Sequence, residues 1–126
     1  LSVDSCLMLG VEADGASVTT VEGLASGDRL DPLQDAFLET GAAQCGFCIP
    51  GQLVSARALL DEVPNPTRVQ IEEGLAGNLC RCAGYEQIME AVELAARRGA
   101  ALEPAPHPPA VTTDVAATPD ANVAPQ

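Results

Sequence analysis

Four of the five cysteines stand in two close pairs. Cys45 and Cys48 flank Gly-Phe, Cys80 and Cys82 flank one arginine, and 31 residues separate the two pairs. Neighbours as close as Cys80 and Cys82 rarely reach the geometry of a disulfide. In a chain without secretory features, such spacing points to a metal before disulfides. Four thiolates from two hairpins suit either a tetrahedral zinc ion or an iron–sulfur cluster.

The surroundings of the cysteines favour a cluster over structural zinc, with free or redox-active thiols third. A helix is predicted to follow each pair, and helix N-termini offer N–H groups and partial positive charge to an anionic centre. Gly46, Gly51 and Gly84 are predicted to let the backbone approach the sulfurs without a Cβ in the way. Arg81 either supplies a compensating charge or faces solvent. A thioredoxin-like site would need a βαβ context that is absent from the pattern.

Four helices are predicted to position the cysteines. Asp31 with Gln34, and Thr67 with Gln70, form capping boxes that open two of them. Gly41 is predicted to end the first of these helices and Gly77 the second. The predicted helical ranges are 32–40, 50–63, 68–76 and 85–98. The predicted inward-facing residues are Leu53, Ala56, Leu60, Val63, Ile71, Leu75, Ile88, Ala91, Val92 and Ala95.

The order helix, cysteine pair, helix occurs twice, which predicts a mainly α fold built as a four-helix bundle. Residues 3–9 and 17–22 are predicted to be two strands around an Asp14-Gly15 turn, as the end of a sheet whose remainder lies upstream. The tail holds six of the ten prolines and is predicted to be disordered. The predicted domains are therefore 1–30, 31–102 and 103–126.

Charge and composition exclude several function classes. The net charge is −12 and no segment is basic, so a nucleic-acid or anionic-membrane partner is not expected. Nothing in the sequence resembles a signal peptide or membrane span, and a cytoplasmic location is expected. The only histidine, His107, lies in the proline-rich tail, so acid–base or hydrolytic chemistry has little support.

Beyond these patterns, the two cysteine segments resemble the small iron–sulfur subunit of the xanthine oxidase family of molybdenum hydroxylases. That family includes aldehyde oxidoreductases and carbon monoxide dehydrogenases. The matching segments read GAAQCGFCIPG (41–51) and GNLCRCAGY (77–85), within a resemblance that runs from Cys6 to about Gly99. Residues 5–25 are similar to the end of the family's N-terminal plant-type ferredoxin domain. The chain, which starts at Leu1, is accordingly interpreted as N-terminally truncated.

The resemblance implies a set of site residues. It implies one [2Fe–2S] cluster held by Cys45, Cys48, Cys80 and Cys82. Gln44 and Cys82 match positions that approach the molybdenum–pterin cofactor (molybdopterin) of a large partner subunit. Cys6 matches the last ligand of a second [2Fe–2S] cluster, whose other ligands are not in this chain.

The implied function is electron transfer, not bond-making catalysis by this chain alone. Electrons would pass from the molybdenum–pterin centre through the cluster toward the second cluster and then FAD on another subunit. The alternative is a structural zinc module, in which four cysteines bound to zinc join two helical hairpins into a domain for interaction with other proteins.

The sequence departs from the family at two positions. The family often has threonine directly after each cysteine pair, where this chain has Ile49 and Ala83. Losing both hydroxyls is predicted to lower the cluster's reduction potential.

Overall fold

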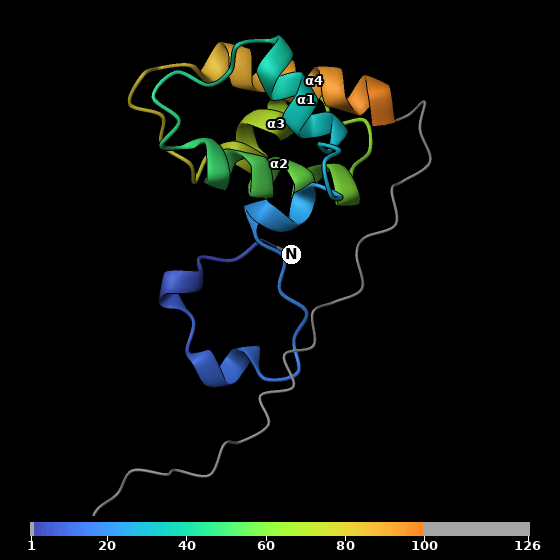
Figure 1. Cartoon of the computed structure of the whole chain (residues 1–126). Helices are drawn as coiled ribbons and strands as arrows, with labels where there is room; N and C mark the ends of the chain where they lie inside the picture. The colour runs from blue at the N-terminus through green and yellow to red at the C-terminus, as the bar shows by residue number, and fades with distance from the viewer. Residues whose placement is uncertain (1, 100–126) are drawn as a thin grey trace, which may run out of the picture.

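The computed structural model describes residues 2–99, which are mainly helical. Four α-helices pack together into one body, with the N-terminal segment lying below it in the view of Figure 1. The predicted helical fold is thus confirmed, whereas the predicted tail, 103–126, lies outside the described residues. The helices are α1 (Pro32–Glu39), α2 (Ile49–Glu62), α3 (Arg68–Leu75) and α4 (Tyr85–Gly99). None of them is both long and apolar enough to span a lipid bilayer.

Local side-chain hydrogen bonds fix where α1 and α3 begin. Asp31 accepts from the N–H of Leu33 at 2.8 Å, while Gln34 accepts from the N–H of Asp31 at 2.9 Å. Thr67 and Gln70 form the equivalent pair at α3, with Gln70 accepting from the N–H of Thr67 at 2.8 Å. Both predicted capping boxes are confirmed, because each satisfies backbone donors that a helix start leaves unpaired.

The core lies between the four helices, where α1 packs mainly on α4 and α2 on α3. Small residues allow this close packing, since Ala36 of α1 and Ala91 of α4 are fully buried. All predicted inward-facing residues are buried except Val63, which is the half-buried C-cap of α2. The buried hydrophobic residues are Leu33, Ala36, Phe37, Ala42, Leu53, Ala56, Leu60, Ile71, Leu75, Cys80, Ile88, Ala91, Val92, Ala95 and Ala96.

Ion pairs link the helices at the surface of this core. The guanidinium of Arg68 in α3 pairs with Glu86 at 2.6 Å and with Glu93 at 3.2 Å, both in α4. Arg98, in the last turn of α4, pairs with Glu39 at the end of α1. Such half-exposed pairs each contribute little stability but help to select the orientation of neighbouring helices.

The prediction of two strands at 3–9 and 17–22 is wrong. Residues 2–99 contain no β-strand, and their one isolated β-bridge joins Ser26 to Arg29. The segment instead forms three short 3-10 helices: η1 (Ser5–Leu7), η2 (Gly10–Ala13) and η3 (Val21–Leu24). Two short strands alone cannot bury enough apolar surface to be stable, so high β-propensity did not decide the structure here.

The exposure of the N-terminal segment agrees with that explanation. Leu7 is 81% exposed and Val11 is 79% exposed, so these apolar side chains are not buried against a sheet. The predicted Asp14-Gly15 turn is present, with the N–H of Ala16 donating to the oxygen of Ala13 at 3.0 Å. Only η3 reaches the helices, because Val21 and Leu24 pack against the core beside α2.

Candidate metal centre

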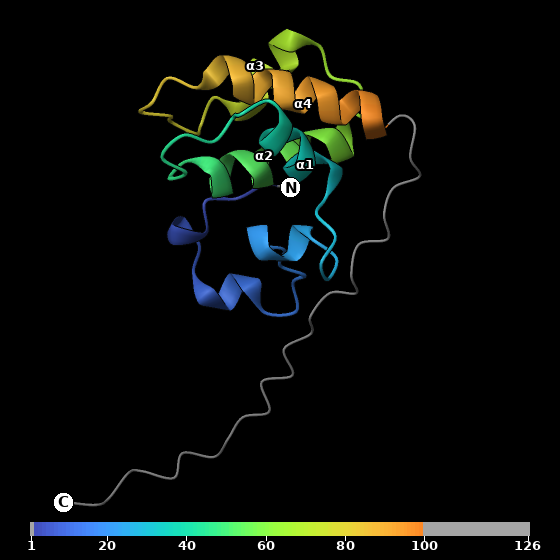
Figure 2. The same cartoon turned by 45° about the horizontal axis from the view of Figure 1, so that its top comes forward.

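The two cysteine pairs lie in two loops at the same end of the helical body. Residues 40–48 connect α1 to α2 and residues 76–84 connect α3 to α4; both loops lie on the left in Figures 1 and 2. Cys48 is the residue immediately before α2, and Cys82 lies three residues before Tyr85, the first residue of α4. The predicted placement of each pair beside a helix N-terminus is therefore confirmed.

The thiols of the two loops lie close together in two pairs. Cys45 and Cys82 are near enough to shift each other's pKa, and so are Cys48 and Cys80. All five cysteines are free thiols. Within residues 2–99, no group of three or more His, Cys, Asp or Glu side chains surrounds a single ion position. Two separate thiol pairs, each with one member from each loop, fit a centre of two irons that takes two ligands per iron.

In the Cys45–Cys82 pair, the two thiols differ in proton affinity. A hydrogen bond from the N–H of Phe47, and then one from the Cys82 thiol, lower the pKa of Cys45. At Cys82 the largest effect, a hydrogen bond from the N–H of Cys45, lowers the pKa. The Cys45 side chain, burial and neighbouring thiolate charge outweigh it, so the pKa of Cys82 is raised.

The Cys48–Cys80 pair repeats the pattern. Burial, followed by the hydrogen bond with Cys80, raises the pKa of Cys48. At Cys80, the hydrogen bond from the N–H of Gly84 is the largest effect and lowers the pKa against the opposing effect of burial. Each pair therefore contains one sulfur whose pKa is lowered and one whose pKa is raised, as expected of two thiols that lie close together.

Gly84 is the point where the two loops touch. Its N–H donates to Cys80 Sγ at 3.4 Å. A Cβ placed on Gly84 would lie 3.3 Å from Gln44 Nε2 and 3.8 Å from Cys80 Sγ. The predicted role of Gly84 as a site of close approach to sulfur is confirmed, because its own N–H reaches Cys80 Sγ and a Cβ there would contact both loops.

The other two glycines act differently. Gly46 adopts a φ of +83°, which favours glycine and turns the chain between Cys45 and Phe47. A Cβ on Gly51 would lie 2.5 Å from Asn78 Oδ1, so the space that Gly51 leaves is filled by an amide and not by a sulfur.

The remaining sequence-predicted residues lie as follows. Gln44 is exposed and adjacent to Gly84, between the two loops. Cys6 is exposed in η1, and no hydrogen bond joins it to the four paired thiols in the described part of the chain. Arg81 is exposed and forms no ion pair within residues 2–99, which matches the solvent-facing interpretation.

Sequence reasoning missed the side chains that hold the second loop. Tyr85 Oη accepts from the N–H of Cys80 at 2.8 Å, and Gln52 Nε2 donates to the carbonyl oxygen of Asn78 at 3.0 Å. Gln52 did carry a signal: it lies four residues before Ala56, on the inward face of α2, where a polar residue needs a partner. Tyr85 carried no such signal, since it stood at the expected start of a helix.

Known proteins resemble this chain over the same region. The profile of the [2Fe-2S] binding domain matches residues 20–93. A probable xanthine dehydrogenase subunit of Bacillus subtilis is 52% identical over 86 residues, covering 68% of this chain and 49% of that protein. The chain thus spans about half the length of that curated relative.

Solved structures agree with the sequence comparisons. Quinoline 2-oxidoreductase from Pseudomonas putida 86 superposes with a TM-score of 0.70 and 50% identity over 77% of this chain and 63% of that chain. The aldehyde oxidoreductase from Desulfovibrio gigas gives a TM-score of 0.74 with 41% identity over 81% of this chain and 12% of that chain. With its paired cysteines in two adjoining loops, the chain belongs to the family of [2Fe–2S]-binding domains.

Proposed function

We propose that this chain is the iron–sulfur electron-transfer subunit of a molybdenum hydroxylase. The observation that carries the proposal is the meeting of four thiols as two cross-loop pairs at the starts of α2 and α4. In this role, Cys45, Cys48, Cys80 and Cys82 hold one [2Fe–2S] cluster, which supplies reversible one-electron storage. The names of similar proteins, which include xanthine dehydrogenase and nicotinate dehydrogenase subunits, support the assignment.

The chain's own groups suit an anionic centre. The N–H of Gly84 points at Cys80 Sγ and the N–H of Phe47 hydrogen-bonds Cys45, so both donors favour negative charge on sulfur. Hydrogen-bond donors of this kind tune the reduction potential of a cluster and lower the reorganisation energy of electron transfer. The rigid packing of α2 and α4 behind the loops keeps these donors in place.

Two exposed apolar residues mark the surface next to the thiols. Phe47 is 93% exposed within the first loop, and Leu79 is 84% exposed within the second. Each is adjacent to a paired cysteine in the sequence, and exposed large apolar side chains beside a functional site favour contact with another protein. We propose that the large molybdenum-cofactor subunit covers this face and that Gln44, beside Gly84, reaches its pterin.

The rest of the proposed relay needs groups beyond the four paired thiols. Cys6 would ligate the second [2Fe–2S] cluster in a longer chain that brings the other ligands, and an FAD subunit would receive the electrons. A zinc-stapled interaction module is not favoured, because the chain belongs to the [2Fe–2S]-binding family.

Electron carriage can be tested on the anaerobically purified chain. We expect dithionite to produce an EPR signal of about one unpaired spin per cluster, because a [2Fe–2S] centre takes up one electron. Reoxidation should restore the visible absorption, and a second cycle should give the same signal. A protein that holds its metal but shows no reducible chromophore would contradict the proposal and would favour zinc.

A further inference from the structure

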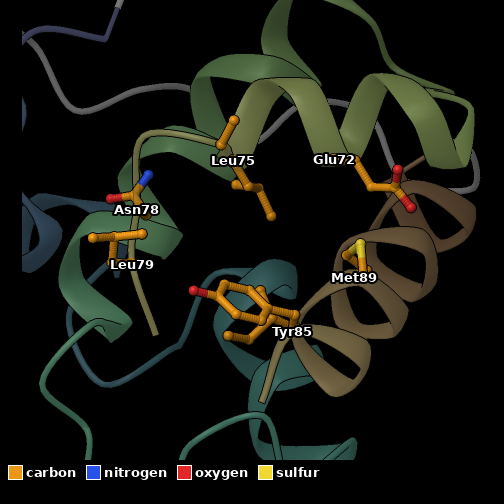
Figure 3. Close-up of a pocket in the computed structure, with 8 residues that line it drawn as sticks. Glu72, Leu75, Asn78, Leu79, Tyr85 and Met89 are labelled. Carbon is orange, nitrogen blue, oxygen red and sulfur yellow. The ribbon is translucent and has the colours of Figure 1, made fainter. Parts of the chain in front are cut away.

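The backbone just before the second cysteine pair is held from two helices at once. On one side, Gln52 of α2 donates to the carbonyl oxygen of Asn78 at 3.0 Å; on the other, Tyr85 of α4 accepts from the N–H of Cys80 at 2.8 Å. Figure 3 shows the Tyr85 hydroxyl directed toward the segment that carries Asn78 and Leu79. We call these two hydrogen bonds the Cys80 clamp.

The α2 side of the clamp is closely fitted. Asn78 Nδ2 also donates to Ser55 Oγ at 2.9 Å, one turn along α2 from Gln52. Asn78 Oδ1 occupies the space where a Cβ on Gly51 would lie, at 2.5 Å. Two hydrogen bonds and one close approach therefore fix Asn78 against the first turns of α2, the helix that begins at the first cysteine pair.

The α4 side of the clamp is a half-exposed tyrosine ring that lines a pocket. Tyr85 lines a pocket of about 240 Å³ together with Leu75, Leu79, Ile88 and Met89, and Figure 3 shows Tyr85 with Leu75, Leu79 and Met89 around this pocket. Ile88 on the wall of this pocket is 1% exposed, whereas Tyr85 itself is 41% exposed. The hydroxyl then reaches the backbone of Cys80, five residues earlier in the chain.

Burial of the Gln52 side chain costs free energy, so core packing alone does not explain a glutamine at this position. Its side chain is fully buried, and its Oε1 has no hydrogen-bond partner within the described structure. An apolar residue of the same shape would avoid the loss of solvation of that oxygen. A polar residue at this position therefore contributes something besides core packing, namely the bond to Asn78.

We infer that Gln52 and Tyr85 are positioning residues that hold Cys80 in place before a cluster binds. The inference rests on the proposed function, because Cys80 acts there as a cluster ligand. Neither side chain is among the four thiols; each acts through the backbone next to Cys80. A ligand fixed in advance loses less conformational freedom on binding and moves less when charge changes.

Two variants test the clamp while keeping its shape. Tyr85→Phe removes the acceptor and keeps the ring; Gln52→Met removes the donor together with the unpartnered oxygen. We expect each cluster-loaded variant to release iron to a chelator about tenfold faster than the parent, equivalent to about 1.4 kcal/mol. In the cluster-free chain, Tyr85→Phe should speed hydrogen exchange at the Cys80 amide by a similar factor, because that N–H loses its acceptor.

Thr67→Ala is the matched control. It removes the N-cap of α3, whose side-chain hydrogen bonds are made with Gln70, and weakens the fold without touching the clamp. We expect its iron release and its Cys80 exchange to stay near the parent values. If iron release and Cys80 exchange were accelerated equally in Thr67→Ala, the inference would be overturned, because loss of overall stability would then explain the effect.

The iron-release and hydrogen-exchange measurements together distinguish a failure of this inference from a failure of the proposed function. Parent-like iron release in both clamp variants, or parent-like Cys80 exchange in Tyr85→Phe, would overturn the clamp while leaving the cluster in place. A parent chain that takes up no cluster would overturn the proposed function. In that case the exchange measurement would still decide whether Tyr85 restrains Cys80.

Discussion

At the residue scale, the candidate centre consists of two pairs of sulfurs, and the two members of each pair have pKa values shifted in opposite directions. Cys45 and Cys80 have lowered pKa values, and their partners Cys82 and Cys48 have raised ones. Because the members of each pair come from different loops, neither loop could produce this arrangement alone. The cysteine spacing predicted that the thiols would meet, but which thiol faces which depends on how the helices pack.

The pKa directions predict an order of thiol reactivity in the cluster-free chain. Thiolates are the reactive form, and a lowered pKa keeps the thiolate populated to lower pH. Cys45, exposed and with a lowered pKa, should therefore be alkylated by iodoacetamide at lower pH than Cys48, whose pKa is raised. Peptide mass spectrometry across a pH series would measure both profiles. Coincident profiles, or Cys48 reacting at the lower pH, would contradict the assignment.

At the element scale, the backbone at the starts of α2 and α4 sets the conformation of the two loops that carry the thiols. Ile49 is the first residue of α2, and its N–H donates to the oxygen of Gly46 at 3.2 Å. Ala83, one residue after the second pair, has a φ of +56°. A β-branched residue is strained in that left-handed region, so a threonine at 83 would add backbone strain to any hydroxyl effect.

Ile49→Thr is therefore a cleaner test of the missing hydroxyl than the double change at 49 and 83. A hydroxyl at the first position of α2 could donate toward cluster sulfur and stabilise the more negative reduced state. We expect the midpoint potential to rise in an EPR-monitored redox titration. Ile49→Val, which shortens the side chain without adding a donor, is the control. An unchanged midpoint in Ile49→Thr would reject the hypothesis.

The elements also show what sequence can and cannot predict. Both capping boxes were predictable, because the bonds of Asp31 and Thr67 are made within three residues. The strands at 3–9 and 17–22 were predicted wrongly, since a strand is stable only when partners bury its face. The Gln52–Asn78 bond joins residues 26 positions apart, so it emerges only after α2 and the second loop have packed.

At the scale of the whole molecule, the core is a support for the two loops. Ile71 of α3 is fully buried, and Cys80 itself is 9% exposed at the edge of the same hydrophobic cluster. The loop that carries Cys80 and the helices are thus parts of one packed unit. Loss of core packing should weaken both the fold and the hold on the thiols.

Ile71→Ala tests this support. Truncating a fully buried isoleucine removes apolar contacts and leaves a cavity, which costs about 2–5 kcal/mol in the free energy of unfolding. Val69→Ala on the same helix, where Val69 is 60% exposed, should cost about 0.5 kcal/mol or less. Urea unfolding of the cluster-free chain would measure both. Equal losses would show that α3 does not pack as described.

We propose that four cross-paired thiols hold one [2Fe–2S] cluster, and native mass spectrometry of the anaerobically purified chain tests this most directly. The measurement should show a mass increase of two iron and two sulfide ions per chain. Cys6→Ser, which changes the exposed cysteine outside the two pairs, should keep this increase, and Cys45→Ser should lose or weaken it. One zinc per chain after iron-replete growth, or an increase that survives in Cys45→Ser but not in Cys6→Ser, would contradict the account.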